Sequence, residues 1–250
     1  QSDSRIERDS MGEVPIPGWA YYGAQTQRAI NNFGVSEHRI PKPFIRALGL
    51  IKKHAAIANG ELGTVDKKLT EAIKVAADEV ISGKWDAHFP IDIFQTGSGT
   101  SWNMNANEVI ANRASEILGS PVGHRDPVHP NDHVNRGQSS NDVIPTALHI
   151  ANSTEMPGLI NAVAKLADSF RKKADSFSGV VKIGRTHLQD AVPMTVGQEF
   201  EGFAVQAQKN ADRLRRTLPN LGELALGGTA VGTGLNTHPE FAERAIAGIA

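Results

Sequence analysis

The stretch Gln138-Ser139-Ser140-Asn141-Asp142-Val143-Ile144-Pro145 decides the fold, because it predicts the start of a long helix. Ser, Asn and Asp are preferred at the N-cap of a helix, and a proline suits its first turn. The apolar positions that follow share one helical face: Leu159, Val163, Leu166 and Phe170. We therefore expect a helix from this stretch to about residue 177, kinked or divided in two at Pro157-Gly158.

One helix cap needs one such side chain, so several polar residues in sequence indicate a second role for Ser139, Ser140 and Asn141. A similar stretch, Gln95-Thr96-Gly97-Ser98-Gly99-Thr100-Ser101, brings glycines and hydroxyls together before another predicted helix. Free N–H groups at a helix N-terminus and nearby hydroxyls bind carboxylates or phosphates. The lysine of a P-loop is missing. Two interpretations remain open, an anion site and a helix cap followed by a turn.

Helical patterns cover most of the remaining chain. Residues 1–35 contain several prolines and glycines, and they are predicted to form an irregular arm with short extended pieces. Helices are expected from Pro43, from about Asp66, over 196–218 and from about Pro239. Aromatic residues make up only 6% of the chain and alanine is plentiful, which fits close-packed helices better than a β-sandwich. The predicted fold class is mainly α.

The composition excludes several classes of function. The net charge of −1 leaves no overall basic footprint for nucleic acid or an anionic membrane. The absence of cysteine excludes disulfides and thiolate chemistry, and it suits a reducing compartment. No apolar run approaches a membrane span, and Gln1-Ser2-Asp3-Ser4 lacks a secretory pattern. We expect no nucleic-acid or membrane partner, and a cytoplasmic location or, in a eukaryote, the mitochondrial matrix.

The stretch Gly184-Arg185-Thr186-His187-Leu188-Gln189-Asp190-Ala191-Val192-Pro193 lies between two predicted helices and places an imidazole beside a hydroxyl. Histidine both gives and takes protons near neutral pH. Arg185 and Asp190 are near enough in sequence to orient His187 and Thr186. A lone Thr-His pair is more often a solvated loop. Beside the two donor-rich stretches, it makes His187 a candidate proton donor or acceptor.

A proline-containing loop carries a further cluster, Val128-His129-Pro130-Asn131-Asp132-His133-Val134-Asn135. Its His-Pro-Asn-Asp turn presents an imidazole, an amide and a carboxylate within one bend. Neither an HExxH nor an EF-hand pattern is present, so anion recognition is favoured over a metal site. The glycine-rich stretch Gly227-Gly228-Thr229-Ala230-Val231-Gly232-Thr233-Gly234 lacks the frame of a dinucleotide site, and a turn crossing near a packed site is expected instead.

Several of these strings, in this order, resemble class II fumarase, of the aspartase/fumarase superfamily. The resemblance runs from Arg5-Ile6-Glu7 to the end of the chain. The strings that carry it are Gly23-Ala24-Gln25-Thr26, Gln95-Thr96-Gly97-Ser98-Gly99-Thr100, Asn103-Met104-Asn105, His129-Pro130-Asn131-Asp132, Gln138-Ser139-Ser140-Asn141-Asp142, Gly184-Arg185-Thr186-His187 and Gly228-Thr229-Ala230-Val231-Gly232-Thr233-Gly234-Leu235-Asn236. It implies reversible hydration of fumarate to malate, a step of the tricarboxylic acid cycle, with no metal and no organic cofactor.

For the fold, the resemblance implies a helical N-terminal domain over residues 1–137 and a long-helix bundle over 138–250. In the family this bundle forms the centre of a homotetramer, and each active site is assembled from three subunits. The apolar faces of the predicted helices 143–177 and 196–218 agree with self-association. The chemistry implied is general acid–base catalysis through a carbanion-like intermediate.

The resemblance also implies roles for individual residues. His187 is implied to be the proton donor or acceptor, working with bound water. The substrate carboxylates are implied to be held by Ser98, Gly99, Thr100, Ser139, Ser140, Asn141 and Thr186. A second dicarboxylate site near the mouth of the active site is implied for His129, Pro130, Asn131 and Asp132.

The sequence departs from the family pattern in places. The family's flexible loop with Gly-Ser-Ser, Met-Pro and a Lys, which supplies the serine base, does not occur in these 250 residues, and neither does its small C-terminal domain. We therefore expect an N-terminal portion of a longer chain. Trp102 stands beside the substrate loop, where a small polar residue is usual.

Two alternatives to the hydratase stay open. Aspartate ammonia-lyase shares the Asn-Met-Asn string and much of the Gly-Arg-Thr stretch, whereas Ser98, His129 and the Ser139-Ser140 pair favour the hydratase. The second alternative is a non-catalytic homologue or assembly subunit, which the missing serine loop favours.

Overall fold

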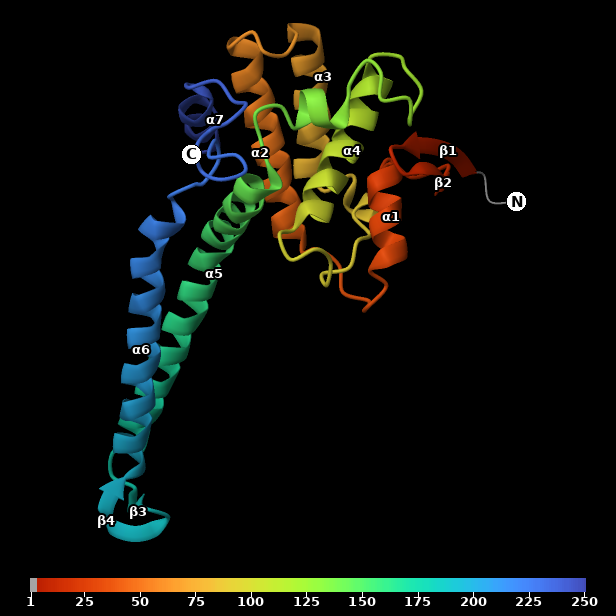
Figure 1. Ribbon diagram of the computed structural model, residues 1–250. Coiled ribbons are helices and arrows are strands. Elements are labelled where there is room, and N and C mark those ends of the chain that lie inside the picture. Colours follow the sequence, from red (N-terminus) through yellow and green to blue (C-terminus); the bar gives the residue numbers. More distant parts are fainter. Residues whose placement is uncertain (1–3) are drawn as a thin grey trace. The chain divides into compact units, whose positions relative to one another are not determined.

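The structure is a computed structural model that describes residues 4–250, and it is built mainly from helices (Figure 1). The first three residues of the predicted arm lie outside the described residues. The elements are β1 Ser4–Asp9, β2 Gly12–Pro17, α1 Ala24–Asn32, α2 Lys42–Glu61, α3 Lys67–Ile81, the 3₁₀ turn η1 Asp86–His88, α4 Thr100–Ile117, the π-helical turn η2 Pro130–Val134, α5 Ser140–Ser176, β3 Val181–Thr186, β4 Gln189–Thr195, α6 Val196–Leu221 and α7 Phe241–Ile249. The predicted fold class, mainly α, is confirmed.

The described chain divides into two compact units. The first unit contains the residues up to 151 together with 224–250, and the second contains residues 152–223. The long helix α5 begins in the first unit and ends in the second. The predicted division of the chain into domains at 137/138 stays a prediction.

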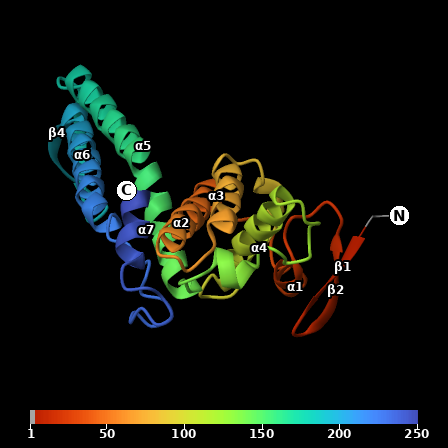
Figure 2. The same ribbon diagram turned by 90° about the horizontal axis from the view of Figure 1, so that it is seen from above.

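The core of the first unit lies where α2, α3 and α4 pack side by side (Figures 1 and 2). Leu48 and Ile51 of α2, Ile73 of α3 and Ile110 of α4 are completely buried. Burial of one such side chain contributes about 1.5–3 kcal/mol. Asp66 caps α3 as predicted, because its carboxylate accepts a hydrogen bond of 2.8 Å from the N–H of Lys68.

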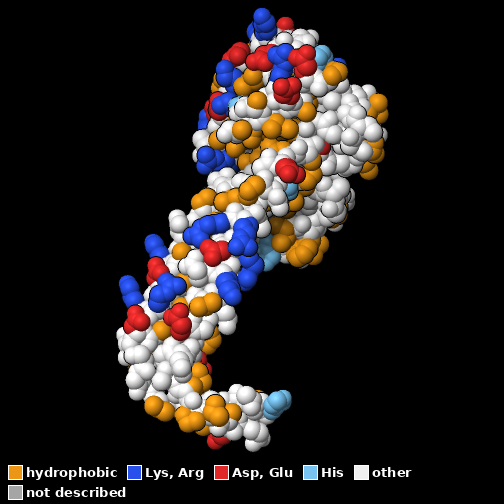
Figure 3. Space-filling view, turned by 90° about the vertical axis from the view of Figure 1, so that its left-hand side faces the viewer, with side chains coloured by type: hydrophobic (Ala, Val, Ile, Leu, Met, Phe, Trp, Pro, Cys, Tyr) orange, Lys and Arg blue, Asp and Glu red, His pale blue; other side chains and the backbone are white. Residues whose placement is uncertain are grey.

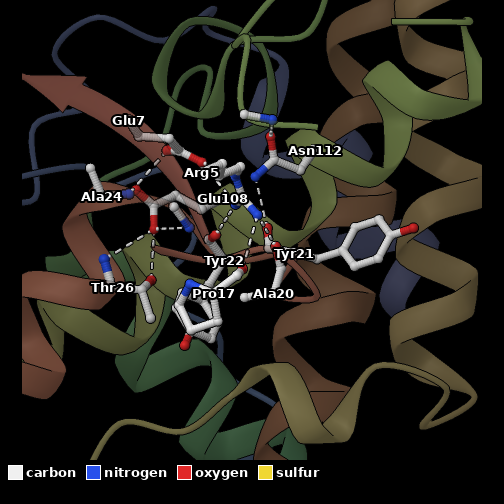
Figure 4. Close-up of polar contacts among 12 residues, drawn as sticks. Arg5, Glu7, Pro17, Ala20, Tyr21, Tyr22, Ala24, Thr26, Glu108 and Asn112 are labelled. Atoms are coloured by element: carbon white, nitrogen blue, oxygen red, sulfur yellow. Dashed lines mark hydrogen bonds and ion pairs between the residues drawn. The ribbon is translucent and has the colours of Figure 1, made fainter. Parts of the chain in front are cut away.

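The N-terminal arm is more regular than predicted, because β1 and β2 form an antiparallel hairpin and α1 follows it. A buried carboxylate from another helix caps α1. Glu108 of α4 accepts hydrogen bonds from the N–H groups of Gly23 (2.9 Å), Gln25 (2.9 Å) and Thr26 (3.0 Å), and from the Thr26 hydroxyl (2.7 Å; Figure 4). A Cβ at Gly23 would lie 2.9 Å from this carboxylate, so only glycine fits there. Burial raises the pKa of Glu108, and the four donors oppose that shift.

A guanidinium completes the anchoring of the arm. Arg5 of β1 donates to the carbonyls of Ala20 (2.6 Å) and Tyr22 (2.7 Å) and forms an ion pair with Glu7 at 2.8 Å (Figure 4). The arm therefore looked irregular in the sequence because its stabilising partners are brought together only by the fold.

The second unit is a hairpin of the two long helices, with the short strands β3 and β4 between them (Figure 1). Phe170 of α5 packs against Phe200 and Phe203 of α6, with ring centroids 6.1 and 5.7 Å apart. Of the two outcomes predicted at Pro157-Gly158, a division is wrong, since α5 runs unbroken over 37 residues, and a kink stays a prediction. Proline removes one N–H from the helix, and the bonds of the other turns are enough to continue it. The β3–β4 hairpin was not predicted.

Apolar side chains are exposed on the long helices. Leu159 and Leu166 of α5 and Phe203 of α6 are 50%, 49% and 43% exposed. Figure 3 shows apolar side chains interspersed with Lys and Arg on one face of the molecule. Among residues 4–250, none of the helices combines the length and the apolar character needed to cross a membrane.

A partly buried ion-pair network joins α3 to α4. Arg113 donates to both oxygens of Glu79 at 2.6 and 2.9 Å, and Trp85 and Lys84 add hydrogen bonds of 2.9 and 2.7 Å to the same carboxylate. These contacts, the one from Arg113 above all, lower the pKa of Glu79 to about 2.

This network predicts a pH-dependent stability. A carboxyl whose pKa is lowered by folding contributes stability that is complete above its unfolded pKa and is lost as the pH falls toward the folded value. We expect Glu79→Gln to lower the free energy of unfolding by about 1.5–3 kcal/mol at pH 7. In urea titrations the difference from the parent shrinks as the pH falls from about 4.5 toward 2. Glu243→Gln, at an exposed position of α7, is the control, and a Glu79→Gln effect independent of pH contradicts the prediction.

Candidate active site

The starts of α4 and α5 lie against each other in the first unit. Gly99 precedes α4 with φ +72°, and a Cβ there would come within 2.9 Å of the Ile144 side chain on α5. One turn further along α4, the Asn103 amide donates to the hydroxyl of Ser140 at 3.1 Å. Ser140 and Ile144 are four residues apart, about 6 Å along the helix axis. The structure thus brings the two predicted donor stretches onto adjoining helical turns.

The hydroxyls of the first stretch are accessible. Ser98 and Thr100 are exposed, and their side-chain oxygens lie 2.9 Å apart in a hydrogen bond. Gly99 is buried, so its role is to let the backbone approach α5 closely. Trp102 packs edge-on against Phe44, with ring centroids 5.2 Å apart, so its ring belongs to the core of the first unit.

Three polar residues at the start of α5 make different hydrogen bonds. The hydroxyl of Ser139 accepts a hydrogen bond from the N–H of Asn141 (3.3 Å), as a helix cap does. The buried carboxylate of Asp142 accepts from the N–H groups of Ser139 (2.9 Å), Gly227 (3.0 Å) and Thr229 (2.8 Å). The Asn141 amide donates to the carbonyl of Ala230 at 2.7 Å. The predicted glycine-rich turn therefore crosses directly over the start of α5.

A buried lysine that no sequence pattern indicated lies behind this site. Lys52 of α2 is 0% exposed, and its ammonium donates to the side-chain oxygens of Asn103 (2.8 Å), Asn135 (2.9 Å) and Gln138 (2.9 Å). Burial lowers its pKa to about 7, and the charge of Asp142 opposes that shift. The sequence provided little indication that Lys52 is buried, because two adjacent lysines in a helix usually lie on its solvent-exposed face.

His187 and Thr186 belong to the second unit. His187 and Leu188 form the two-residue turn between β3 and β4, with φ +48° and +61°. Two positive φ angles characterise the type I′ turn, which usually contains Asn-Gly. Such backbone conformations are strained in other residues and are often found at functional sites. Thr186, His187 and Leu188 are exposed, and Arg185 pairs with Asp190 across the strands at 3.2 Å.

The predicted second anion site is a single tight turn. His129 caps the π-helical turn η2, with its Nδ1 accepting from the N–H groups of Asn131 (3.3 Å) and Asp132 (3.2 Å). The same nitrogen lies 3.2 Å from the Asp132 carboxylate. Pro130 is buried, and its ring fixes the φ angle at the start of the turn.

A polar cavity of about 520 Å³ lies beside this turn. Asn131 and Asp132 line it together with Arg136, Gln138 and His238. A smaller cavity of about 130 Å³ reaches Ser139 and Thr229. Within residues 4–250, no group of three or more His, Asp or Glu side chains is arranged to bind a metal ion.

Comparison with known proteins shows the family to which the chain belongs. A family model described as lyase matches residues 12–250. The chain belongs to the lyase family. It is 60% identical over 97% of its length to a class II fumarate hydratase of Halobacterium salinarum, and it covers 52% of that protein. It is 54% identical over 96% of its length to a mitochondrial fumarate hydratase of Danio rerio, and it covers 48% of that protein.

Structural comparison agrees with the sequence matches. The crystal structure of a recombinant class II fumarase from Schistosoma mansoni matches with a TM-score of 0.91 and 44% identity, over 99% of this chain and 52% of that one. The predicted resemblance to class II fumarase is therefore confirmed. The lyase chain described here spans about half the length of the curated relatives it matches.

The close approach of α4 and α5 predicts that Gly99 tolerates no side chain. Gly99→Ala places a Cβ against Ile144 and forces an L-residue into the left-handed region, which costs about 1–2 kcal/mol before any clash. Gly97→Ala is the matched control two residues away, since a Cβ there meets no described heavy atom within 4 Å. We expect guanidinium unfolding to show a loss only for Gly99→Ala, and equal stability of the two variants contradicts this packing.

Proposed function

We propose that the protein containing this chain catalyses the reversible hydration of fumarate to malate. The single observation that carries the proposal is the junction of α4 and α5. There a Cβ at Gly99 would lie 2.9 Å from the Ile144 side chain, and the Asn103 amide donates to the Ser140 hydroxyl. This junction places two donor-rich helix N-termini side by side. The similarity to proteins named class II fumarate hydratase supports the same reaction.

The residue types suit this chemistry. Hydration adds the elements of water across a carbon–carbon double bond that lies between two carboxylates. The carbanion-like intermediate shifts negative charge onto the adjacent carboxylate, so fixed N–H and O–H donors stabilise it most in the transition state. We assign this binding to Ser98, Gly99, Thr100, Ser139, Ser140, Asn141 and Thr186.

Proton transfer is assigned to His187. An imidazole exchanges protons at neutral pH, and a bound water links it to the substrate carbon or the departing hydroxide. The strained turn fixes the backbone of His187, which suits a group that must be held in one orientation.

The His129–Asp132 turn is proposed as a second dicarboxylate site, near the mouth of the active site. An imidazole N–H of His129 and the adjacent side-chain amide of Asn131 are donors suited to a carboxylate. Arg136 in the same cavity supplies positive charge.

The assembly proposed is a homotetramer with active sites built from three subunits. No nucleic-acid or membrane partner is proposed. The proposed location is the cytoplasm, or the mitochondrial matrix in a eukaryote, which the similarity to a mitochondrial relative supports.

The function is tested by assaying the full-length protein for fumarate hydration and for aspartate deamination. Hydration alone supports the proposal, deamination alone supports the ammonia-lyase alternative, and neither activity supports a non-catalytic homologue. We expect His187→Asn to reduce hydration turnover by about 10²–10⁴-fold, as for loss of a general acid–base group.

A neighbouring variant controls for the turn itself. Asn readily adopts positive φ, so both His187→Asn and Leu188→Asn preserve the backbone of the hairpin. Leu188→Asn changes a side chain that is 95% exposed, and we expect turnover within a few-fold of the parent. Turnover of His187→Asn equal to that of the control rules out the assigned proton transfer.

Self-association is expected of the purified chain. The exposed apolar side chains of α5 and α6 gain about 25 cal/mol for each Å² that a second copy buries. Light scattering across a dilution series should show an oligomer at micromolar concentration. Leu166→Asp should weaken it, while Lys165→Asp at the next, exposed position should have little effect. A folded monomer that binds no hydrophobic dye contradicts the prediction.

A further inference from the structure

The Lys52 ammonium is saturated by protein oxygens. All of its surface is buried, and its donors are used by the side-chain oxygens of Asn103, Asn135 and Gln138. An unpaired charge in this position would be strongly destabilising. Burial lowers the pKa of Lys52, and the charge of Asp142 opposes that shift. The three amide oxygens are acceptors only, so the hydrogen bonds to them need the charged form with its three N–H donors.

An ammonium group offers only donors, so it determines which way each amide faces. Each of the three amides must turn its oxygen toward Lys52 and its NH₂ group away. The NH₂ of Asn103 therefore reaches Ser140 Oγ at 3.1 Å and Asn135 Oδ1 at 3.2 Å. The NH₂ of Gln138 donates to the carbonyls of Val134 and Arg136.

The direction of the Asn103 amide decides what the Ser140 hydroxyl can do. A serine hydroxyl has one proton to donate, and it accepts from its neighbours. With the NH₂ of Asn103 on its oxygen, Ser140 keeps its proton free for an acceptor outside the protein. With the amide reversed, the hydroxyl would donate inward to the Asn103 oxygen and be lost to a ligand.

We propose that Lys52 is a positioning residue, which acts through Asn103 to keep the Ser140 hydroxyl as a hydrogen-bond donor to a substrate carboxylate. The inference rests on the proposed function to the extent that a dicarboxylate is the ligand. Lys52 itself is sealed from the ligand by Asn103, Asn135 and Gln138.

A double-mutant cycle on the full-length protein tests this inference, with succinate as a non-reacting dicarboxylate and calorimetry as the measurement. Loss of one hydrogen bond to a charged group weakens binding by about tenfold or more. We expect Ser140→Ala and Lys52→Met each to weaken succinate binding to this extent. Because both remove the same donor, the double variant should be little weaker than either single variant.

A second variant guards against misfolding of Lys52→Met. Asn103→Asp keeps the ammonium paired but presents oxygen to Ser140, so the hydroxyl donates inward. It should weaken succinate binding as Ser140→Ala does, again without additivity. Glu108→Gln is the control, because Glu108 is an equally buried charge in the cap of α1. It should lower stability and leave the succinate affinity unchanged.

The outcomes separate this inference from the function. The positioning role is overturned if the effects of Ser140→Ala and Lys52→Met on succinate affinity are additive, or if Asn103→Asp leaves that affinity unchanged. It is also overturned if the parent protein binds no succinate. A parent that binds succinate with the expected coupling but hydrates no fumarate leaves the positioning role standing and refutes the proposed reaction.

Discussion

Two buried charges of opposite sign organise the start of α5, and the geometry of the donor stretches depends on them. The ammonium of Lys52 donates hydrogen bonds to side-chain oxygens on α4 and in the turn before α5. The carboxylate of Asp142 accepts hydrogen bonds from N–H groups of the glycine-rich turn. A buried charge tolerates little displacement, since each lost partner costs about 1–3 kcal/mol or more. These hydrogen bonds therefore fix the relative position of segments that are more than 80 residues apart in the sequence. Hydrophobic packing alone would fix that position less precisely.

Close approach of other groups explains where the first unit needs glycine. Gly99 allows α4 to approach α5, as Gly23 allows the Glu108 carboxylate to reach the start of α1. In the second unit the strained turn of His187 and Leu188 is stabilised by pairing across the strands, such as Arg185 with Asp190.

Local patterns were sufficient to predict most helices and the cap at Asp66, because helical period and capping depend on residues a few positions apart. They also located the polar stretches before α4 and α5. They failed for Lys52 and Glu108, whose partners lie 51–86 and 82–85 residues away. The β3–β4 hairpin was missed because its turn, His187-Leu188, lacks the glycine or asparagine that marks such turns. His187 became a candidate through its chemistry, whereas its positive φ could not be predicted from the sequence.

The surplus of polar residues at the start of α5 now has a physical explanation. A carboxylate ligand needs donors, but a hydroxyl donates outward only when its acceptor side is already occupied by the protein. The Ser139 oxygen accepts from the N–H of Asn141, and the Ser140 oxygen accepts from the amide of Asn103. Capping and ligand binding are therefore not competing explanations of this stretch. In the proposed site, the bonds that cap and anchor the helix occupy the acceptor side of both hydroxyls and leave their protons for the anion.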